Sequence, residues 1–128
     1  MPSWTEYKEI ARSKGVLAKE LFVVFSNPIV PLDDMMETLP QHLAYQGELE
    51  ARGVLVMAGP MADESGQNMV GESLIIYRAN SIEEARAVAD KDPMHIAGKK
   101  AYTVRPWLLN EGRLELSIGL SDQSVGFG

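Results

Sequence analysis

The chain of 128 residues carries a net charge of −6 at neutral pH and contains no cysteine. The acidic balance argues against a nucleic-acid partner, because binding to a phosphate backbone requires clustered Lys and Arg. The absence of cysteine excludes disulfides, thiolate zinc sites and cysteine nucleophiles. No apolar run approaches the ~20 residues that span a bilayer, and no signal-peptide pattern opens the chain, so we expect one cytoplasmic domain without a membrane partner.

The first two elements are predicted to be an amphipathic helix and a buried strand. Residues 3–14 place apolar side chains at helical spacing, Ser3 is a suitable N-cap, and Gly15 ends the helix. Residues 21–25 form an unbroken β-forming run, which is typical of a strand that is buried on both faces. Pro28 then interrupts the strand.

His42 lies in a segment, residues 32–52, that is predicted to be helical. Pro40 disfavours the helical conformation at the residue before it, so the segment either kinks there or begins a new helix with Pro40 in its first turn. Met35, His42 and Leu49 are spaced by seven residues and therefore share one stripe. This stripe directs the His42 side chain toward the edge of the core rather than into bulk water.

The middle of the chain predicts a β-hairpin. Residues 54–58 form a strand that we expect to end at Gly59 and Pro60. A polar loop over residues 62–71 follows, and residues 73–78 predict the strand that pairs with the first.

A second helix and a fourth strand complete the pattern. Ser81 and Glu84 form a capping box at the start of the helix, and the helix is expected to end before Pro93. Residues 101–107 predict the strand, which we expect Pro106 to stop.

The order of these elements, a helix followed by β-α-β-β-α-β, is the ferredoxin-like pattern of an α+β fold. It implies a four-stranded antiparallel sheet with both helices on one face. The other face carries apolar side chains that no helix covers, and an apolar face of this size usually binds a partner. The simplest partner is a second copy, sheet against sheet. A tail from residue 110, with a strand-like piece at 114–118, either adds an edge strand or is loose.

Five short pieces of sequence, taken in their order and spacing, resemble the YCII-related (YciI-like) family of dimeric α/β-barrel proteins. They are HLAY at residues 42–45, AGPM at 58–61, SIEEA at 81–85, DP at 92–93 and PW at 106–107. The resemblance runs from about residue 21 to residue 107. It implies one YCII-related domain over residues 1–128, with its core at about 20–108, an extra N-terminal helix at 3–15 and a C-terminal extension at 109–128.

This resemblance also implies a homodimer, or a higher oligomer, in which each sheet and its helices enclose a pocket. The pocket would contain a His–Asp pair, which falls on His42 and Asp92. One branch of the family is similar to enzymes that dehydrochlorinate hydroxylated aromatic-ring metabolites, and related dimeric barrels isomerise muconolactones. The extra segments at both ends of this chain are additions that would close or reshape such a pocket.

A pair formed by His42 and Asp92 would be an acid–base site. The carboxylate accepts the proton of one ring nitrogen and fixes the tautomer, and the other nitrogen exchanges a proton with a ligand near neutral pH. Such chemistry needs neither a cofactor nor a metal, and we expect neither. In the alternative interpretation, His42 is a half-buried helix residue bonded to a backbone carbonyl, and Asp92 only ends a helix.

Four residues are further candidates for contacts with a small-molecule ligand. Arg105 would pair with a carboxylate, Tyr77 would line the pocket, Ser73 would offer a hydroxyl, and Gly59 would expose backbone N–H groups. Ordinary positions in strands and turns are the alternative for each of them. His95 is expected at the surface. Several methionines indicate an adaptable cavity wall or ordinary core packing: Met35, Met36, Met57, Met61 and Met69.

Three functions fit these observations. The first is a small cofactor-independent enzyme, of the lyase or isomerase type, that uses His42 and Asp92 on a small cyclic or aromatic-derived metabolite. The second is a non-catalytic small-molecule-binding or stress-associated homodimer, because a fold does not determine a function. The third is an accessory domain that joins a larger complex through its tail and sheet edge.

Overall fold

The computed structural model describes residues 1–128, which form two compact units. The core unit spans Glu20–Leu108, and the second unit combines the two chain ends, Met1–Lys19 and Leu109–Gly128. No helix in the chain is both long enough and apolar enough to cross a bilayer.

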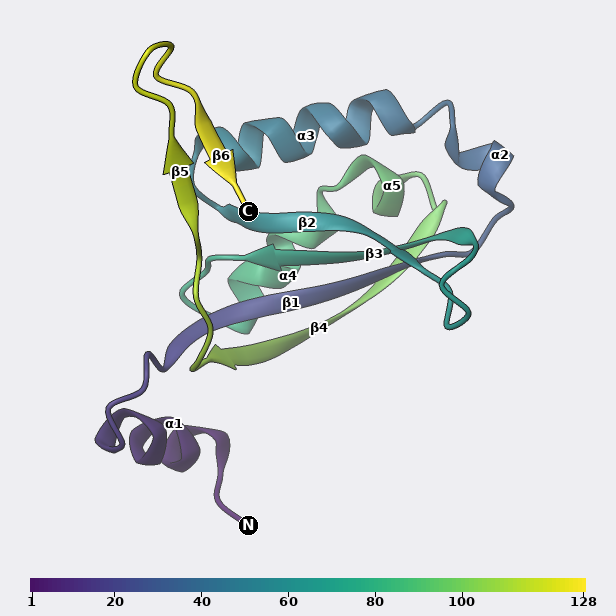
Figure 1. The fold of residues 1–128 in the computed structure, drawn as a ribbon. Coiled ribbons are helices and arrows are strands. Elements are labelled where there is room, and N and C mark those ends of the chain that lie inside the picture. Colours follow the sequence, from purple (N-terminus) through teal and green to yellow (C-terminus); the bar gives the residue numbers. More distant parts are fainter. The chain divides into compact units, whose positions relative to one another are not determined.

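The core unit is a four-stranded sheet with its helices on one face (Figure 1). The strand order is β2-β3-β1-β4, with β1 and β2 each pairing antiparallel with β3. The predicted ferredoxin-like fold is therefore confirmed, and the sheet of one chain is open rather than closed into a barrel. The strands are β1 (Lys19–Pro28), β2 (Leu55–Ala62), β3 (Met69–Tyr77) and β4 (Lys100–Leu109), and the helices are α2 (Leu32–Met35), α3 (Leu39–Ala51), α4 (Ile82–Asp90) and α5 (Pro93–Ile96).

The hydrophobic core lies between the sheet and the helices. Val24 of β1 is paired with Ile75 of β3, and both side chains are fully buried. They pack with Tyr77, with Leu49 of α3 and with Ala89 of α4. β1 is a central strand, which explains why its sequence is an unbroken apolar run rather than an alternating one.

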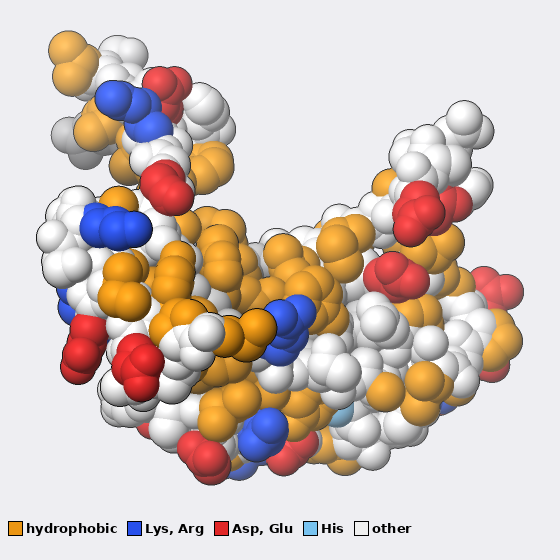
Figure 2. All heavy atoms as spheres, turned by 90° about the horizontal axis from the view of Figure 1, so that it is seen from below, with side chains coloured by type: hydrophobic (Ala, Val, Ile, Leu, Met, Phe, Trp, Pro, Cys, Tyr) orange, Lys and Arg blue, Asp and Glu red, His pale blue; other side chains and the backbone are white.

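The opposite face of the sheet carries the alternate residues of the same strands. Val23 is paired with Ile76 and Phe25 with Leu74. Together with residues of β2 and β4 they line a groove of about 380 Å³, and hydrophobic side chains gather in the middle of the space-filling view in Figure 2. The residues that complete the groove are Met61, Arg105, Pro106 and Trp107.

The helical segment that contains His42 is divided at Pro40. α2 ends at Met35, and a separate helix, α3, begins at Leu39 with Pro40 in its first turn. Of the two alternatives left open by the sequence, the new helix is therefore the one that forms. His42 and Leu49 are both buried on α3 as the stripe predicts, while Met35 belongs to α2.

Three of the expected strand limits are wrong. β3 begins at Met69, inside the polar loop expected over residues 62–71. β2 continues through Gly59 and Pro60 to Ala62, and β4 continues through Pro106 to Leu109. Proline removes only one hydrogen-bond donor from a strand, and β2 and β4 are the two edge strands of the sheet, where that donor need not be paired. Proline therefore ends neither strand.

The second unit contains a helix and a hairpin. α1 (Trp4–Ser13) is capped by Ser3, whose Oγ accepts a hydrogen bond of 3.1 Å from the backbone N–H of Glu6, as predicted. β5 (Leu116–Ile118) pairs antiparallel with β6 (Val125–Phe127), so the tail pairs with itself rather than adding an edge strand to the sheet.

Candidate acid–base site

His42 and Asp92 form a buried hydrogen-bonded pair, although 50 residues separate them in the sequence. The Nδ1–H of His42 donates to both carboxylate oxygens of Asp92, at 2.8 and 2.9 Å. The exposed fraction is 8% for His42 and 1% for Asp92. Because Nδ1 carries the proton in this arrangement, the neutral imidazole presents a lone pair at Nε2.

Asp92 is held in place by a second hydrogen bond. It is the N-cap of the short helix α5, and its Oδ1 accepts a bond of 2.9 Å from the backbone N–H of Met94. Pro93 occupies the first position of that helix, where its fixed φ suits the helical conformation and its missing N–H is not needed. The Asp-Pro sequence therefore both begins α5 and fixes the carboxylate that faces His42.

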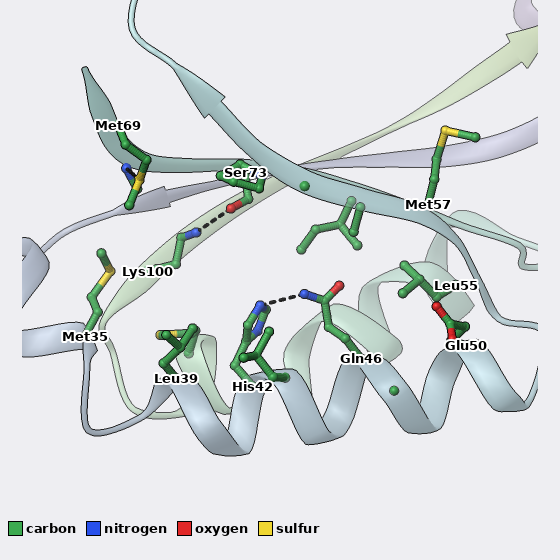
Figure 3. Close-up of a pocket in the computed structure, with 18 of the residues that line it drawn as sticks. Met35, Leu39, His42, Gln46, Glu50, Leu55, Met57, Met69, Ser73 and Lys100 are labelled. Carbon is green, nitrogen blue, oxygen red and sulfur yellow. Dashed lines mark hydrogen bonds between the residues drawn. The ribbon is translucent and has the colours of Figure 1, made fainter. Parts of the chain in front are cut away.

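The other nitrogen of His42 contacts a side chain on the same helix. The carboxamide nitrogen of Gln46 lies 2.7 Å from His42 Nε2, as Figure 3 shows. Gln46 follows His42 by four residues, which places both side chains on one face of α3. The amide N–H thus donates to the imidazole lone pair.

His42 and Gln46 line a cavity of about 800 Å³ between the helices α2 and α3 and the strands β2 and β3 (Figure 3). Most of its wall is apolar, and its size suits a small organic molecule. Five of the seven methionines of the chain contribute to it: Met35, Met36, Met57, Met69 and Met94.

A second polar pair, Lys100 and Ser73, lines the same cavity. Lys100 is buried, with 7% of its surface exposed, and its Nζ donates a hydrogen bond of 3.0 Å to Ser73 Oγ (Figure 3). Burial lowers the pKa of the Lys100 ammonium, while the negative charges of Asp92 and Glu72 act in the opposite direction. The cavity therefore contains a partly desolvated cation that a ligand with an acidic oxygen would satisfy.

The four residues expected to contact a ligand fall into two groups. Ser73 and Gly59 line the cavity. Tyr77 lies in the hydrophobic core, where burial raises the pKa of its hydroxyl and no hydrogen-bond partner is present. Arg105 lines the groove on the opposite face of the sheet and so does not reach the cavity of His42.

His95 is half-buried rather than fully exposed, and its ring is fixed by hydrogen bonds. Its Nδ1–H donates to the carbonyl oxygen of Ala89 at 2.6 Å, and its Nε2 lies 2.7 Å from Ser26 Oγ, which donates to it. The ring also lies close to that of Tyr102, with 4.8 Å between centroids. Both nitrogens are therefore engaged in structural bonds. No group of three His, Asp or Glu side chains is arranged to hold a metal ion.

Lys100 and Gln46 were not recognised in the sequence, although a signal exists for each. Every second residue of β4, namely Lys100, Tyr102 and Val104, faces the helices. Lys100 was missed because the strand was expected to begin one residue later, at residue 101. Gln46 is the residue one helical turn after His42. Its role depends on which ring nitrogen of His42 carries the proton. That nitrogen is identified only by the contact of His42 with Asp92.

Known proteins resemble a large part of this chain. Residues 20–108 match the model of the YCII-related domain. The uncharacterized protein YjpA of Bacillus subtilis (strain 168) is 31% identical over 75 residues, which is 59% of this chain and 81% of YjpA. The solved structure of 5-chloro-2-hydroxyhydroquinone dehydrochlorinase (TftG) from Burkholderia phenoliruptrix AC1100, in complex with 2,5-dihydroxybenzoquinone, has a TM-score of 0.56 and 26% identity, covering 68% of this chain and 92% of TftG.

Proposed function

Because this chain belongs to the YCII-related domain family, we propose that the cavity of His42 is the active site of a cofactor-independent acid–base enzyme. Its substrates would be small cyclic or aromatic-derived compounds, and its reaction would be of the lyase or isomerase type. The observation that carries the proposal is the buried bond between His42 Nδ1 and Asp92, which leaves Nε2 as the reactive nitrogen beside an apolar cavity.

Three further observations support this class of substrate. The wall is mostly apolar, which suits a ring, and its polar groups lie at separate points. The structural neighbour TftG is named for its action on a chlorinated hydroxyhydroquinone and was solved with a dihydroxybenzoquinone. The cation of Lys100, with the hydroxyl of Ser73, would bind an oxygen that is acidic or that gains negative charge during the reaction.

The proposed chemistry requires proton transfer and, in the lyase case, the departure of a leaving group. In the lyase case, the substrate reacts from its keto tautomer, in which the ring carbon that bears the leaving group is tetrahedral. His42 Nε2 accepts a proton from a conjugated hydroxyl or an adjacent ring carbon, the electron pair of that O–H or C–H bond forms the new double bond, and the leaving group departs with the pair of its own bond. In the isomerase case, the same nitrogen returns the proton to another carbon. A well-placed acid–base group of this kind contributes ~10²–10⁴-fold to a rate.

A direct experiment tests the proposal. The protein is incubated with 5-chloro-2-hydroxyhydroquinone without oxygen, because hydroquinones oxidise in air, and the release of chloride is followed. Binding of 2,5-dihydroxybenzoquinone is measured by calorimetry. Chloride release above the uncatalysed rate supports the enzyme. Binding without any chemical change supports the small-molecule-binding protein instead, and the absence of both contradicts the proposed substrate class.

Replacing Lys100 by methionine tests the contribution of the lysine cation to ligand binding. Methionine keeps most of the volume but removes the cation, so we expect the Kd for 2,5-dihydroxybenzoquinone to rise more than tenfold, the equivalent of ~1.5–3 kcal/mol for a hydrogen bond to a charged group. Arg105→Met, on the opposite face of the sheet, is the matched control and should leave Kd unchanged. An unchanged Kd in Lys100→Met would remove Lys100 from the proposed site.

The lowered pKa of Lys100 also predicts whether Lys100→Met is more or less stable than the wild type. The folded protein holds this proton less tightly than the unfolded chain, so the lysine opposes folding at neutral pH. That cost disappears as the pH rises through the folded pKa toward the ordinary value of 10.5. Lys100→Met is therefore expected to be at least as stable as the wild type at pH 7, and denaturant unfolding at pH 7 and above pH 10 checks this difference.

We also propose that the protein is a homodimer formed through the open face of the sheet. The apolar pairs Val23–Ile76 and Phe25–Leu74, with Trp107 beside them, support a sheet-to-sheet contact. Sedimentation equilibrium at micromolar concentration should therefore give twice the mass of 14.1 kDa. A monomer over the whole concentration range would contradict the proposed dimer.

A further inference from the structure

In the carboxamide of Gln46, the nitrogen forms a hydrogen bond and the oxygen does not. Its nitrogen donates to His42 Nε2 at 2.7 Å. Its oxygen, Oε1, is buried and accepts no hydrogen bond. A buried amide normally uses its acceptor as well as its donors, so the free oxygen calls for a physical explanation.

The protonation of His42 supplies that explanation. Asp92 holds Nδ1 in its protonated form, so the proton that His42 gains or loses in a reaction is the one on Nε2. With Nε2 bare, the imidazole needs a donor, and the amide nitrogen of Gln46 provides it. With Nε2 protonated, the imidazolium needs an acceptor, and the unpartnered amide oxygen of Gln46 can serve. Half a turn of the carboxamide about its last bond exchanges the two atoms.

We propose that Gln46 is a positioning residue that holds His42 in both of its protonation states by turning its carboxamide over. The inference rests on the proposed acid–base role of His42 and deepens it. Before the substrate arrives, Gln46 donates to the bare nitrogen. When the imidazolium is not bonded to a ligand, Gln46 accepts a hydrogen bond from its Nε2–H. A glutamine suits this position because its carboxamide offers a donor and an acceptor of nearly the same shape.

The arrangement has a consequence for a ligand in the cavity. His42 Nε2 is occupied by Gln46 when the cavity is empty, so a substrate must displace the amide to reach it. The nitrogen is therefore shielded from small reagents as well. Reactivity of His42 toward such a reagent measures the Gln46 contact without any assumption about the natural substrate.

Two measurements test this role. The first is NMR of the side-chain amide of Gln46 while pH is varied. Its signals should move together with those of the His42 ring, because the amide changes partner when Nε2 is protonated. The side-chain amide of Gln41, exposed on the same helix, should not follow His42. Gln46 signals that ignore the titration of His42 would overturn the proposal.

The second measurement is the rate at which diethyl pyrocarbonate modifies each histidine, read by peptide mass spectrometry. Gln46→Met removes both hydrogen bonds at similar volume, and we expect His42 to react about tenfold faster than in the wild type. Gln46→Glu offers only an acceptor, so His42 should become reactive only at higher pH. Gln41→Met is the matched control, and His95 is the internal reference in every variant.

The outcomes distinguish this inference from the proposed function. An unchanged rate at His42 in Gln46→Met would show that Gln46 does not shield the nitrogen and would contradict the positioning role. Faster modification, with Gln46 signals that follow His42, supports the role even if no ring compound is turned over. In that case the proposed function fails while the coupling of Gln46 to His42 stands.

Discussion

Replacing His42 by asparagine is expected to lower turnover of a hydroxylated chloro-ring compound by ~10²–10⁴-fold and to leave the protein folded. The amide nitrogen of asparagine lies near the position of Nδ1 and can still donate to Asp92, whereas nothing replaces Nε2. The variant therefore removes the proton-transfer group while it keeps the buried hydrogen bond. Chloride release measures the effect, and circular dichroism with thermal unfolding verifies the fold.

His95→Asn is the matched control for this experiment. His95 is half-buried and is also bonded through both nitrogens, but it does not line the cavity. Its replacement should therefore change stability more than turnover. If His42→Asn retains turnover within a factor of about three of the wild type, the acid–base role of His42 is wrong, because that change is far below the contribution expected of such a group.

The second large effect is expected at Asp92, where alanine and asparagine should act differently. Asp92→Ala removes the N-cap of α5, at ~1 kcal/mol, and leaves the buried Nδ1–H of His42 unpaired, at ~1–3 kcal/mol. We expect a loss of ~2–4 kcal/mol in the free energy of unfolding. Urea denaturation with matched slopes measures it.

Asp92→Asn should preserve most of that stability and lose the activity. Asparagine is as good an N-cap as aspartate, and its volume is the same. It has no negative charge to stabilise the imidazolium and only one acceptor atom, so turnover should fall by ~10²-fold or more. Equal turnover in Asp92→Asn and the wild type would mean that Asp92 is a helix cap alone, which is the alternative interpretation of the sequence.

The fold was predictable because its elements depend on local patterns. The apolar run of β1, the capping residues at Ser81 and the break at Pro40 each predict an element from a few neighbouring residues, and all three elements form. Ser81 caps α4 as predicted, whereas Glu84 accepts from the backbone N–H of Asn80 rather than from that of Ser81. The strand ends at Pro60 and Pro106 were wrong because the effect of a proline depends on whether its strand lies at an edge. Whether a strand lies at an edge depends on the whole sheet and cannot be predicted from the residues near the proline.

The site was predictable only in part, and for the same reason. The stripe on α3 places His42 at the core, and the Asp-Pro sequence places Asp92 at a helix start, but their contact depends on the packing of α3 against α5. The sequence makes Arg105 a candidate for the site because it is a cation on a strand. The register of β4 places Arg105 on one face of the sheet and Lys100 on the other, so a shift of one residue exchanges the two cations.

The five methionines of the cavity wall have a consequence for the selectivity of the site. An unbranched thioether side chain rearranges at little cost, so the wall can close around rings that carry different substituents. Affinity should therefore change little across a series of ligands that differ only in their apolar groups, and it should change sharply when an oxygen is moved around the ring. Oxidation of these thioethers to sulfoxides would make the wall polar. The affinity for bulky rings should therefore fall after exposure to peroxide.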